Sequence, residues 1–385
     1  MKSIDKSWEI GFKGEERMEK IRLGDICIKQ SSKFAQKDLE KLEGGYPVYG
    51  ASGLIKKINV YHQDKEYVAI VKDGAGIGRT MFLPAKSSVI GTLQYLIPKE
   101  DINAKYLYYA VKSRHLEKYF TGTTIPHIYF KDYQNERIVW HRKTEQKYIV
   151  SVLENIEKII DIREQELQKM DELIKARFIE MFIATDVASE WPYCTIADVS
   201  NDMRTGPFGS ALHHDEFVDS GVFVLGIDNA VENKFSYNRM RYITEEKYQQ
   251  LKRYTVYPGD VIITIMGTVG RSAVIPADMP KAINTKHLAC ITPNVEMVNA
   301  QFLSCAFQIH PGIRMQLQNQ SKGAIMDGLN LTIIKGLSFR IPPINLQNQF
   351  VEFYKQTDKS KVVIQKALDE AKLLFDSLMQ KYFGQ

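Results

Sequence analysis

The segment Gly74-Ala75-Gly76-Ile77-Gly78-Arg79-Thr80 is where residue type and spacing first suggest chemistry, because glycine-rich turns can bind nucleotide phosphates. A dinucleotide-binding loop or a P-loop requires a helix directly after the turn, whose N-terminus holds the phosphate. Here Met81-Phe82-Leu83-Pro84 follows, which is typical of a strand. The first glycine and the lysine of a P-loop are also missing, since Asp73 and Arg79 occupy those positions. We therefore interpret this segment as a turn between two strands.

Other catalytic patterns are incomplete. Pro342-Pro343 is part of the motif with which adenine methyltransferases hold a flipped base, but apolar residues flank it. Glu245-Glu246-Lys247 has nuclease-like residue types without the preceding Pro-Asp, and His213-His214 has no adjacent metal-ligand pattern. HExxH and GxSxG motifs are absent from the sequence. The sequence thus predicts a non-catalytic protein without a metal site, with a nucleotide-dependent enzyme that uses the Gly74–Thr80 loop as an alternative.

Composition is that of a globular protein and identifies no partner by itself. The chain has 385 residues, 44% hydrophobic and 25% charged, with a formal net charge of +5 that permits a polyanionic partner. Its four cysteines form no CxxC pair, which favours a reducing cytoplasm over a disulfide framework. We expect neither a signal peptide nor a membrane span, because the N-terminus is charged and no run of about 18 apolar residues occurs.

The chain contains two copies of one unit. The matching pairs occur in the same order along the chain: Leu23–Ile26 with Ile196–Val199, Tyr67–Pro84 with Gly259–Pro276, Ile102–Val111 with Val298–Phe307, Gly122 with Gly323, and Glu145–Leu153 with Leu346–Tyr354. The central match is ungapped and places Gly78-Arg79 on Gly270-Arg271. A repeat of this length is a whole domain followed by a helix, because solenoid repeats have about 20 to 50 residues.

The elements that position any functional residues therefore form an α+β fold. Short β-branched runs that end at glycine, such as Val68–Val71 and Val261–Ile265, predict buried strands, and Ala104–Lys118 and Ala300–Ile309 have helical spacing. We expect two similar mixed α/β domains and two long helices that pair as an antiparallel coiled coil. The predicted boundaries are residues 1–143 for domain 1, 144–185 for helix 1, 186–343 for domain 2 and 344–385 for helix 2.

Both predicted helices carry apolar residues every seven positions, with a polar interruption midway at Arg163 and at Thr357 and Lys361. An apolar stripe of this period favours a partner helix, although each helix could instead pack on its own domain. At about 1.5 Å per residue, each helix would form a rod of roughly 55 Å and act as a spacer. The predicted interface residues are Leu153, Ile156, Ile160, Leu167, Met170, Ile174, Phe350, Ile364, Leu368, Phe375 and Leu378.

The order of these features resembles the specificity subunits of type I restriction-modification systems from about Ile21 to Phe383. The residues that carry the resemblance are Leu-Gly-Asp-Ile at 23–26, Thr-Gly-Pro-Phe-Gly-Ser at 205–210 with Leu212, the segments that end at Arg79 and Arg271, and Pro342, Pro343 and Gln347. The first copy departs from the pattern. It has Gln30-Ser31-Ser32-Lys33 in the region of the Thr-Gly-Pro string and His141-Arg142 in place of Pro-Pro, which weakens the transfer of residue roles.

The resemblance implies a division of labour between chains. Each domain would be a target recognition domain that reads one half of a bipartite, asymmetric site in double-stranded DNA. The paired helices would set the gap and dock two DNA adenine methyltransferase subunits, and a motor-nuclease subunit would join. No cofactor is expected in this chain, and S-adenosylmethionine, ATP and Mg²⁺ would belong to the partners. A structural adaptor that reads no DNA remains an alternative.

Candidate DNA contacts are loop residues with hydrogen-bonding or positively charged side chains, because arginine and lysine pair with guanine or phosphate and other polar groups bond base edges. In the first domain these are Lys29, Lys33, Tyr49, Lys72, Arg79, His127 and Lys131. In the second they are Arg204, Ser210, His213, Lys286, Arg314 and Lys322. We expect Gly122, Gly209 and Gly323 to be needed for the backbone conformation of their loops and not for contact with DNA.

Overall fold

The computed structural model describes residues 19–121, 126–208, 211–321 and 329–384. The chain divides into two compact units, and the two long helices pass through both. The first unit comprises residues 1–164 and 365–385, and the second comprises residues 165–364. Each unit therefore contains one globular domain together with one half of each helix.

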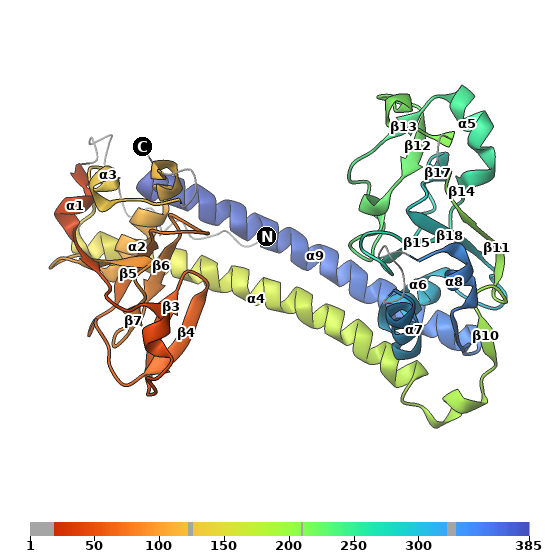
Figure 1. Ribbon diagram of the computed structural model, residues 1–385, viewed down its shortest axis with the longest axis horizontal. Coiled ribbons are helices and arrows are strands. Elements are labelled where there is room, and N and C mark those ends of the chain that lie inside the picture. The colour runs from red at the N-terminus through yellow and green to blue at the C-terminus, as the bar shows by residue number, and fades with distance from the viewer. Residues whose placement is uncertain (1–18, 122–125, 209–210, 322–328, 385) are drawn as a thin grey trace, which may run out of the picture. The chain divides into compact units, whose positions relative to one another are not determined.

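The first domain is built on an antiparallel four-stranded sheet in the order β2-β8-β5-β6, of which β5 and β6 are labelled in Figure 1. A smaller sheet, β4-β3-β7, includes a parallel β3–β7 pair, and β1 and β9 form an antiparallel pair that closes the domain. Its strands are β1 (Lys20–Arg22), β2 (Cys27–Ser31), β3 (Tyr46–Gly50), β4 (Gly53–Ile58), β5 (Tyr67–Val71), β6 (Thr80–Leu83), β7 (Ser88–Val89), β8 (Leu93–Pro98) and β9 (Arg137–Val139). Its helices are α1 (Leu23–Ile26), η1 (Gln36–Leu39), α2 (Ala104–Lys112), η2 (Leu116–Tyr119) and α3 (Phe130–Tyr133).

The second domain repeats this topology with the order β11-β18-β15-β16 in its antiparallel sheet. Its mixed sheet, β13-β12-β17-β14, contains a parallel β12–β17 pair and one extra strand, and β10 pairs with β19. Its strands are β10 (Tyr193–Thr195), β11 (Ser200–Thr205), β12 (Val222–Leu225), β13 (Tyr242–Ile243), β14 (Thr255–Val256), β15 (Val261–Thr264), β16 (Ser272–Val274), β17 (Ala282–Asn284), β18 (Leu288–Pro293) and β19 (Ser338–Arg340). Its helices are η3 (Asp186–Glu190), η5 (His214–Glu216), η6 (Ile227–Asn229), α5 (Glu245–Leu251), η7 (Lys252–Tyr254), α6 (Ala300–Ile309), α7 (Pro311–Ser321) and α8 (Leu331–Gly336).

The α+β prediction is therefore confirmed, but the ungapped alignment of the central match is wrong by one residue. Val71 N–H donates to the Arg79 carbonyl, and the equivalent bond in the second copy runs from Thr264 to Arg271. The β5–β6 turn thus spans residues 72–78, whereas the β15–β16 turn spans residues 265–270. The sequence match aligned the glycines of the two turns. The strand pairing, which only the structure shows, makes the second turn one residue shorter than the first.

A repeated polar contact fixes the point where each long helix begins. The Gln146 side chain accepts a hydrogen bond from Asn103 N–H (2.9 Å) and donates to the His141 carbonyl (3.0 Å). In the second copy, Gln347 accepts from Asn299 N–H (2.9 Å) and donates to the carbonyls of Met297 (3.0 Å) and Pro342 (2.8 Å). Both glutamines are fully buried. Each amide therefore ties the start of its helix to the domain that precedes it.

The long helices α4 (Lys143–Phe182) and α9 (Ile344–Phe383) pair antiparallel within each unit (Figure 1). In the second unit, Lys361 forms an ion pair with Asp171, and the ring centroids of Phe350 and Phe182 lie 5.5 Å apart. In the first unit, Lys372 forms an ion pair with Glu164 (2.7 Å). All predicted interface residues are buried or half-buried. The predicted antiparallel pairing is confirmed.

The helix ends also pack into the domain cores, so the two packing modes weighed from the sequence coexist. Leu153 of α4 and Phe383 of α9 are fully buried in the first domain's core, together with Tyr106 of α2. The second domain's core likewise includes Phe178 of α4 and Phe350 of α9. Among the described residues, no helix combines the length and the apolar run needed to cross a membrane.

We expect Leu368→Ala to lower the free energy of unfolding by about 2–5 kcal/mol, because the Leu368 side chain lies in the apolar stripe and is only 3% exposed. Urea unfolding followed by circular dichroism measures this change. Leu373→Ala is the matched control, because Leu373 on the same helix is 72% exposed and should change stability by no more than about 0.5 kcal/mol. Equal effects of the two substitutions would contradict the packing of the stripe.

Candidate nucleic-acid interface

The glycine-rich segment of the first domain is the turn between β5 and β6, as predicted. It is held by backbone bonds to two other loops: Lys72 N–H donates to the Thr92 carbonyl (3.0 Å), and Ile128 N–H donates to the Lys72 carbonyl (3.0 Å). Gly78 is required there, because its φ is +81° and a Cβ would lie 2.4 Å from the Glu117 nitrogen. We call this set of backbone bonds the turn frame.

The second domain has the same turn frame with different residues. Ile265 N–H donates to the His287 carbonyl (2.9 Å), and Leu329 N–H donates to the Ile265 carbonyl (2.7 Å). With the one-residue correction, Ile265 takes the position of Lys72 and His287 that of Thr92. Ile265 is only 1% exposed, so the position that Lys72 occupies in the first turn frame holds a buried core residue in the second. The two domains thus present different chemistry on one backbone scaffold.

Three of the predicted contacts in the first domain meet at its turn frame. The Asp73 carboxylate forms an ion pair with Lys72 (3.1 Å) and contacts Nδ1 of the His127 ring. The His127 ring packs 4.0 Å from the Tyr129 ring, and the Lys131 ammonium lies 5.3 Å from that ring's centre. Asp73 and Tyr129 were not identified from the sequence. A carboxylate that accepts and cations that donate, beside an exposed aromatic ring, are suited to base edges and phosphates.

The other predicted residues of the first domain lie around this cluster or away from it. The Arg79 guanidinium donates to the Ala51 carbonyl (2.8 Å), and half-buried Tyr49 accepts from Ile90 N–H through its carbonyl (3.0 Å). Lys33 is exposed in a loop joined to the frame by a bond from Gly91 N–H to the Phe34 carbonyl. Lys29 is exposed on β2.

In the second domain, predicted Lys286 is exposed directly after the parallel strand β17. Its neighbour His287 is half-buried, and burial, followed by the charges of Lys286 and Arg241, lowers the pKa of its imidazole. Arg241 forms an ion pair with Asp228 and was not identified from the sequence. Ligands often bind beyond the carboxyl ends of adjacent parallel strands, where Lys286 lies.

The Thr-Gly-Pro string crosses this same end of the sheet. Gly206 N–H donates to the Thr285 carbonyl (3.2 Å), and a Cβ on Gly206 would lie 2.2 Å from the Thr285 carbonyl carbon. Only glycine allows this approach. Phe208 of the same string is 56% exposed. Predicted Ser210, together with Lys322, Gly122, Gly209 and Gly323, lies outside the described residues.

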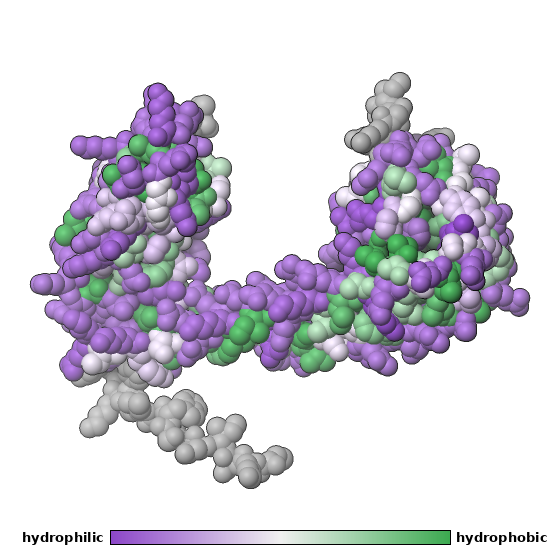
Figure 2. Space-filling view, turned by 90° about the horizontal axis from the view of Figure 1, so that it is seen from below, coloured by the Kyte–Doolittle hydropathy of each residue, from purple (hydrophilic) through white to green (hydrophobic). Residues whose placement is uncertain are grey.

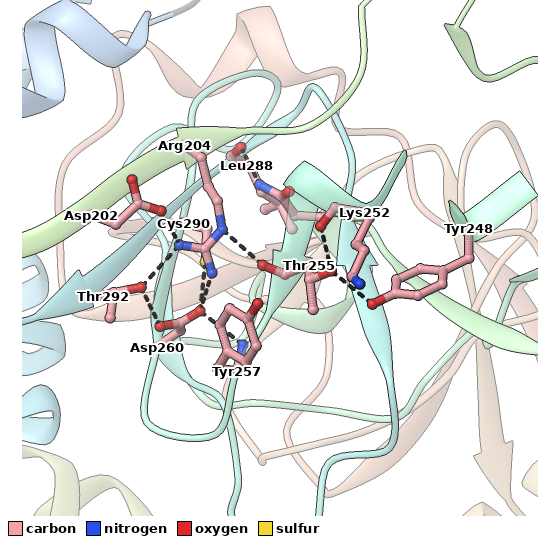
Figure 3. Close-up of polar contacts among 11 residues, drawn as sticks. Asp202, Arg204, Tyr248, Lys252, Thr255, Tyr257, Asp260, Leu288, Cys290 and Thr292 are labelled. Atoms are coloured by element: carbon pink, nitrogen blue, oxygen red, sulfur yellow. Dashed lines mark hydrogen bonds and ion pairs between the residues drawn. The ribbon is translucent and has the colours of Figure 1, made fainter. Parts of the chain in front are cut away.

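Arg204 is held inside the second domain by contacts that favour a structural role (Figure 3). Its Nη2 pairs with the Asp260 carboxylate, which is 1% exposed, and its Nη1 donates to Asp202 (2.7 Å) and Thr292 (2.9 Å). Its Nε donates to the Thr255 carbonyl (2.8 Å). All three guanidinium nitrogens are therefore engaged, and a DNA contact by Arg204 remains a prediction that this geometry disfavours.

The Asp260 carboxylate is supported by further donors. The Thr292 hydroxyl donates to it (2.7 Å), as does Tyr257 N–H (2.8 Å), and the Cys290 thiol lies 3.2 Å away. Burial, and then the charge of Asp260, raise the pKa of Cys290, so the thiol stays protonated and can donate. This network could not be predicted from the sequence, because its members come from four separate strands and turns.

The remaining predicted residues are exposed. His213 precedes the short helix η5, where its N–H donates to the Glu216 side chain (2.7 Å). Arg314 lies on α7 and donates to the Gln308 carbonyl (2.9 Å).

Comparison with known proteins now identifies the family. The model of the type I restriction modification DNA specificity domain matches the chain twice, over residues 15–172 and 189–372. The chain belongs to this family. The two matches correspond to the two copies found in the sequence, each with most of its long helix.

Two curated relatives are specificity subunits of type I restriction enzymes. The MjaVIII subunit of Methanocaldococcus jannaschii is 24% identical in an alignment that covers 66% of this chain and 65% of that relative. The EcoBI subunit of Escherichia coli is 20% identical in an alignment that covers 74% of this chain and 66% of that relative. The match thus spans about two thirds of the length of each relative.

Solved structures share the fold of this specificity-domain protein. The S subunit of a type I restriction-modification system from M. genitalium has a TM-score of 0.63 at 15% identity, covering 98% of this chain and 99% of that one. A chain from a study of complex assembly and conformational transition of the type I R-M system has a TM-score of 0.56 at 13% identity, covering 94% and 97%.

We expect Arg204→Met to destabilise the second domain by about 3–5 kcal/mol, because it leaves the buried Asp260 carboxylate without its cationic partner. Arg253→Met is the control, because the exposed Arg253 side chain packs on Tyr254 at the surface. Thermal or urea unfolding of both variants measures the difference. A variant as stable as the parent would refute the structural role of Arg204.

Proposed function

We propose that this chain is the DNA-reading specificity subunit of a type I restriction-modification complex in the cytoplasm. Each domain would read one half of a bipartite, asymmetric site in double-stranded DNA. The paired helices would set the distance between the halves and dock two DNA adenine methyltransferase subunits. A motor-nuclease subunit would complete the complex.

The observation that carries this proposal is the turn frame shared by the two domains. The same backbone bonds hold Lys72, Asp73 and His127 in the first domain and His287 with Lys286 in the second. A repeated scaffold with unlike polar side chains is suited to a ligand with two similar but distinct parts. DNA half-sites are such a ligand, because each base pair presents its own pattern of donors and acceptors in the major groove.

Exposed apolar residues on the helices support the docking of two similar partners. Apolar areas interrupt the hydrophilic surface of the helices (Figure 2). Ile162 of α4 and its repeat counterpart Val363 of α9 are 53% and 69% exposed, and Leu173 and its counterpart Leu374 are 46% and 50% exposed. Ile162 and Leu374 belong to the first unit, and Leu173 and Val363 belong to the second. Each unit therefore offers one version of the same apolar pair, which favours one partner copy per unit.

Chemistry would come from the partner chains. S-adenosylmethionine would be bound by the methyltransferases, and ATP and Mg²⁺ by the motor-nuclease. The Gly74–Gly78 turn leads into strand β6, which leaves no helix N-terminus for a nucleotide phosphate. This disfavours the alternative of a nucleotide-dependent enzyme. A structural adaptor that reads no DNA would share the helices and is separated from our proposal by the next experiment.

Co-expression of the chain with a type I DNA adenine methyltransferase subunit should produce methylated adenines at one bipartite motif, with two short defined halves and an unspecified gap. Mapping of methylated adenines tests this, and native mass spectrometry of the complex should give two methyltransferase copies per chain. A contiguous motif would refute the proposal that each domain recognises one half of the site. A complex that methylates no defined site would support the alternative of a structural adaptor.

We expect Lys72→Ala and His127→Ala to relax one half of this motif and Lys286→Ala to relax only the other, because each turn frame serves one domain. A lost base contact reduces discrimination by about 1–3 kcal/mol. Methylome mapping of each variant gives the base frequencies in both halves. Lys37→Ala is the control, because Lys37 is exposed on η1 and forms no ion pair with another described residue. Simultaneous relaxation of both halves by one variant would contradict the assignment.

A further inference from the structure

A cavity of about 350 Å³ lies beside the β15–β16 turn of the second domain. Arg271, the first residue after the turn, lines one part of it, and Arg314 of α7 lines another. Asn233, Gln308 and Gln318 also line it, and none of the described residues around the cavity carries a carboxylate. Two cations without a neighbouring acid form a surface that favours an anion.

The two arginines are available to a ligand. Arg271 is exposed, and its guanidinium forms no hydrogen bond or ion pair with the rest of the described chain. Arg314 uses Nη1 to bond the Gln308 carbonyl, which positions the guanidinium and leaves its other nitrogens free toward the described residues. Gln308 itself is fixed, because its Nε2 donates to the carbonyls of Asn233 and Ser272 (both 3.2 Å).

The first domain provides an internal comparison, because the repeat places Leu116 opposite Leu317 and therefore Glu117 opposite Gln318. Gly78 lies directly against the Leu116–Glu117 backbone, whereas a Cβ on its counterpart Gly270 would lie 3.3 Å from the Leu317 side chain. Four residues separate Val111 from Leu116, but nine separate the equivalent Phe307 from Leu317. The longer connection contains Arg314. The shorter connection also contains cations, but Lys112 pairs with Glu157 of α4 (4.0 Å), and the buried Arg114 donates to the carbonyls of Arg137 and Phe383. The second copy therefore differs in having an exposed arginine, Arg314, near the glycine turn and an amide where the first has a carboxylate.

We propose that this cavity binds a phosphate group of the DNA backbone next to the half-site read by the second domain. The inference rests on the proposed function, because it requires the chain to bind DNA. A planar guanidinium group can donate two parallel N–H bonds to two oxygens of one phosphate, and two such groups line this cavity. Because phosphate is common to every sequence, this contact supplies affinity and position and leaves base preference to the turn frame.

The test uses the complex of this chain with its methyltransferase and a labelled duplex that contains the methylated motif. Fluorescence anisotropy at several KCl concentrations gives the affinity and its salt dependence. Relative to the parent, Arg271→Gln/Arg314→Gln should weaken binding on the order of tenfold and lower the salt slope by about 0.9, the value for one phosphate contact. Methylome mapping of the same variant should return an unchanged motif.

Two further variants sharpen the result. Gln318→Glu keeps both arginines but introduces the carboxylate of the first copy, and it should also weaken DNA binding. Arg253→Gln removes an exposed arginine of the same domain outside the cavity and should leave the slope unchanged. A methylphosphonate scan of the duplex should find one neutralised position that weakens the parent and no longer affects the double variant. Thermal unfolding confirms that each variant is folded.

The possible outcomes distinguish a failure of the proposed function from a failure of the phosphate site alone. A parent complex without DNA affinity overturns the proposed function. A parent that binds DNA, with double-variant affinity and slope equal to the parent's, overturns the phosphate site alone. Relaxation of one motif position in the double variant would show that the arginines read a base, which also overturns it. Stabilisation of the parent by 5′-dAMP that the double variant loses, without a change in DNA affinity, would identify a free nucleotide as the ligand and overturn the DNA assignment.

Discussion

The rest of the structure depends on one constraint: the core of each domain buries residues from both long helices. The first domain buries Leu153 of its own helix together with Phe383 from the far end of the sequence. The second domain buries Phe178 and Phe350 in the same way. Neither domain therefore completes its apolar core from one repeat, and folding of each unit requires the antiparallel helix pair. The buried amides of Gln146 and Gln347 then determine where each helix leaves its domain.

In the turn frame of each domain, the backbone maintains the geometry and the side chains supply the chemistry that can contact a ligand. The turn frame uses only backbone N–H and carbonyl groups, so it persists while the side chains on it change from Lys72 to Ile265 and from Thr92 to His287. Glycines at close approaches, such as Gly78 and Gly206, belong to the frame and not to the ligand chemistry. Binding specificity can then vary without a loss of fold stability, as expected for loops carried by a rigid scaffold.

Much of the fold was predictable from the sequence because its signals are periodic or repeated. The seven-residue stripe from Leu153 to Ile174 identified the faces of the helices, and the ordered matches identified the domains. Side-chain partners across the fold carried no such signal. Lys72 and His127 were chosen by residue type, but only the tertiary structure brings Asp73 between them. Arg204 was chosen by the same criterion and is instead engaged by Asp260, which lies on a neighbouring turn. The one-residue difference between the two glycine turns likewise depends on strand pairing.

The segment from Phe307 to Leu317, which comprises the end of α6 and the start of α7, has a consequence for how such proteins diversify. It is longer than the corresponding connection in the first copy, yet the strands on either side keep their order and the buried leucine keeps its place against the glycine turn. The additional residues belong to α7, which forms its own backbone hydrogen bonds, so the sheets need not change to accommodate them. A small insertion at a helix–helix junction can thus bring an exposed arginine to the glycine turn of one domain, and that domain can change while the other keeps its original preference.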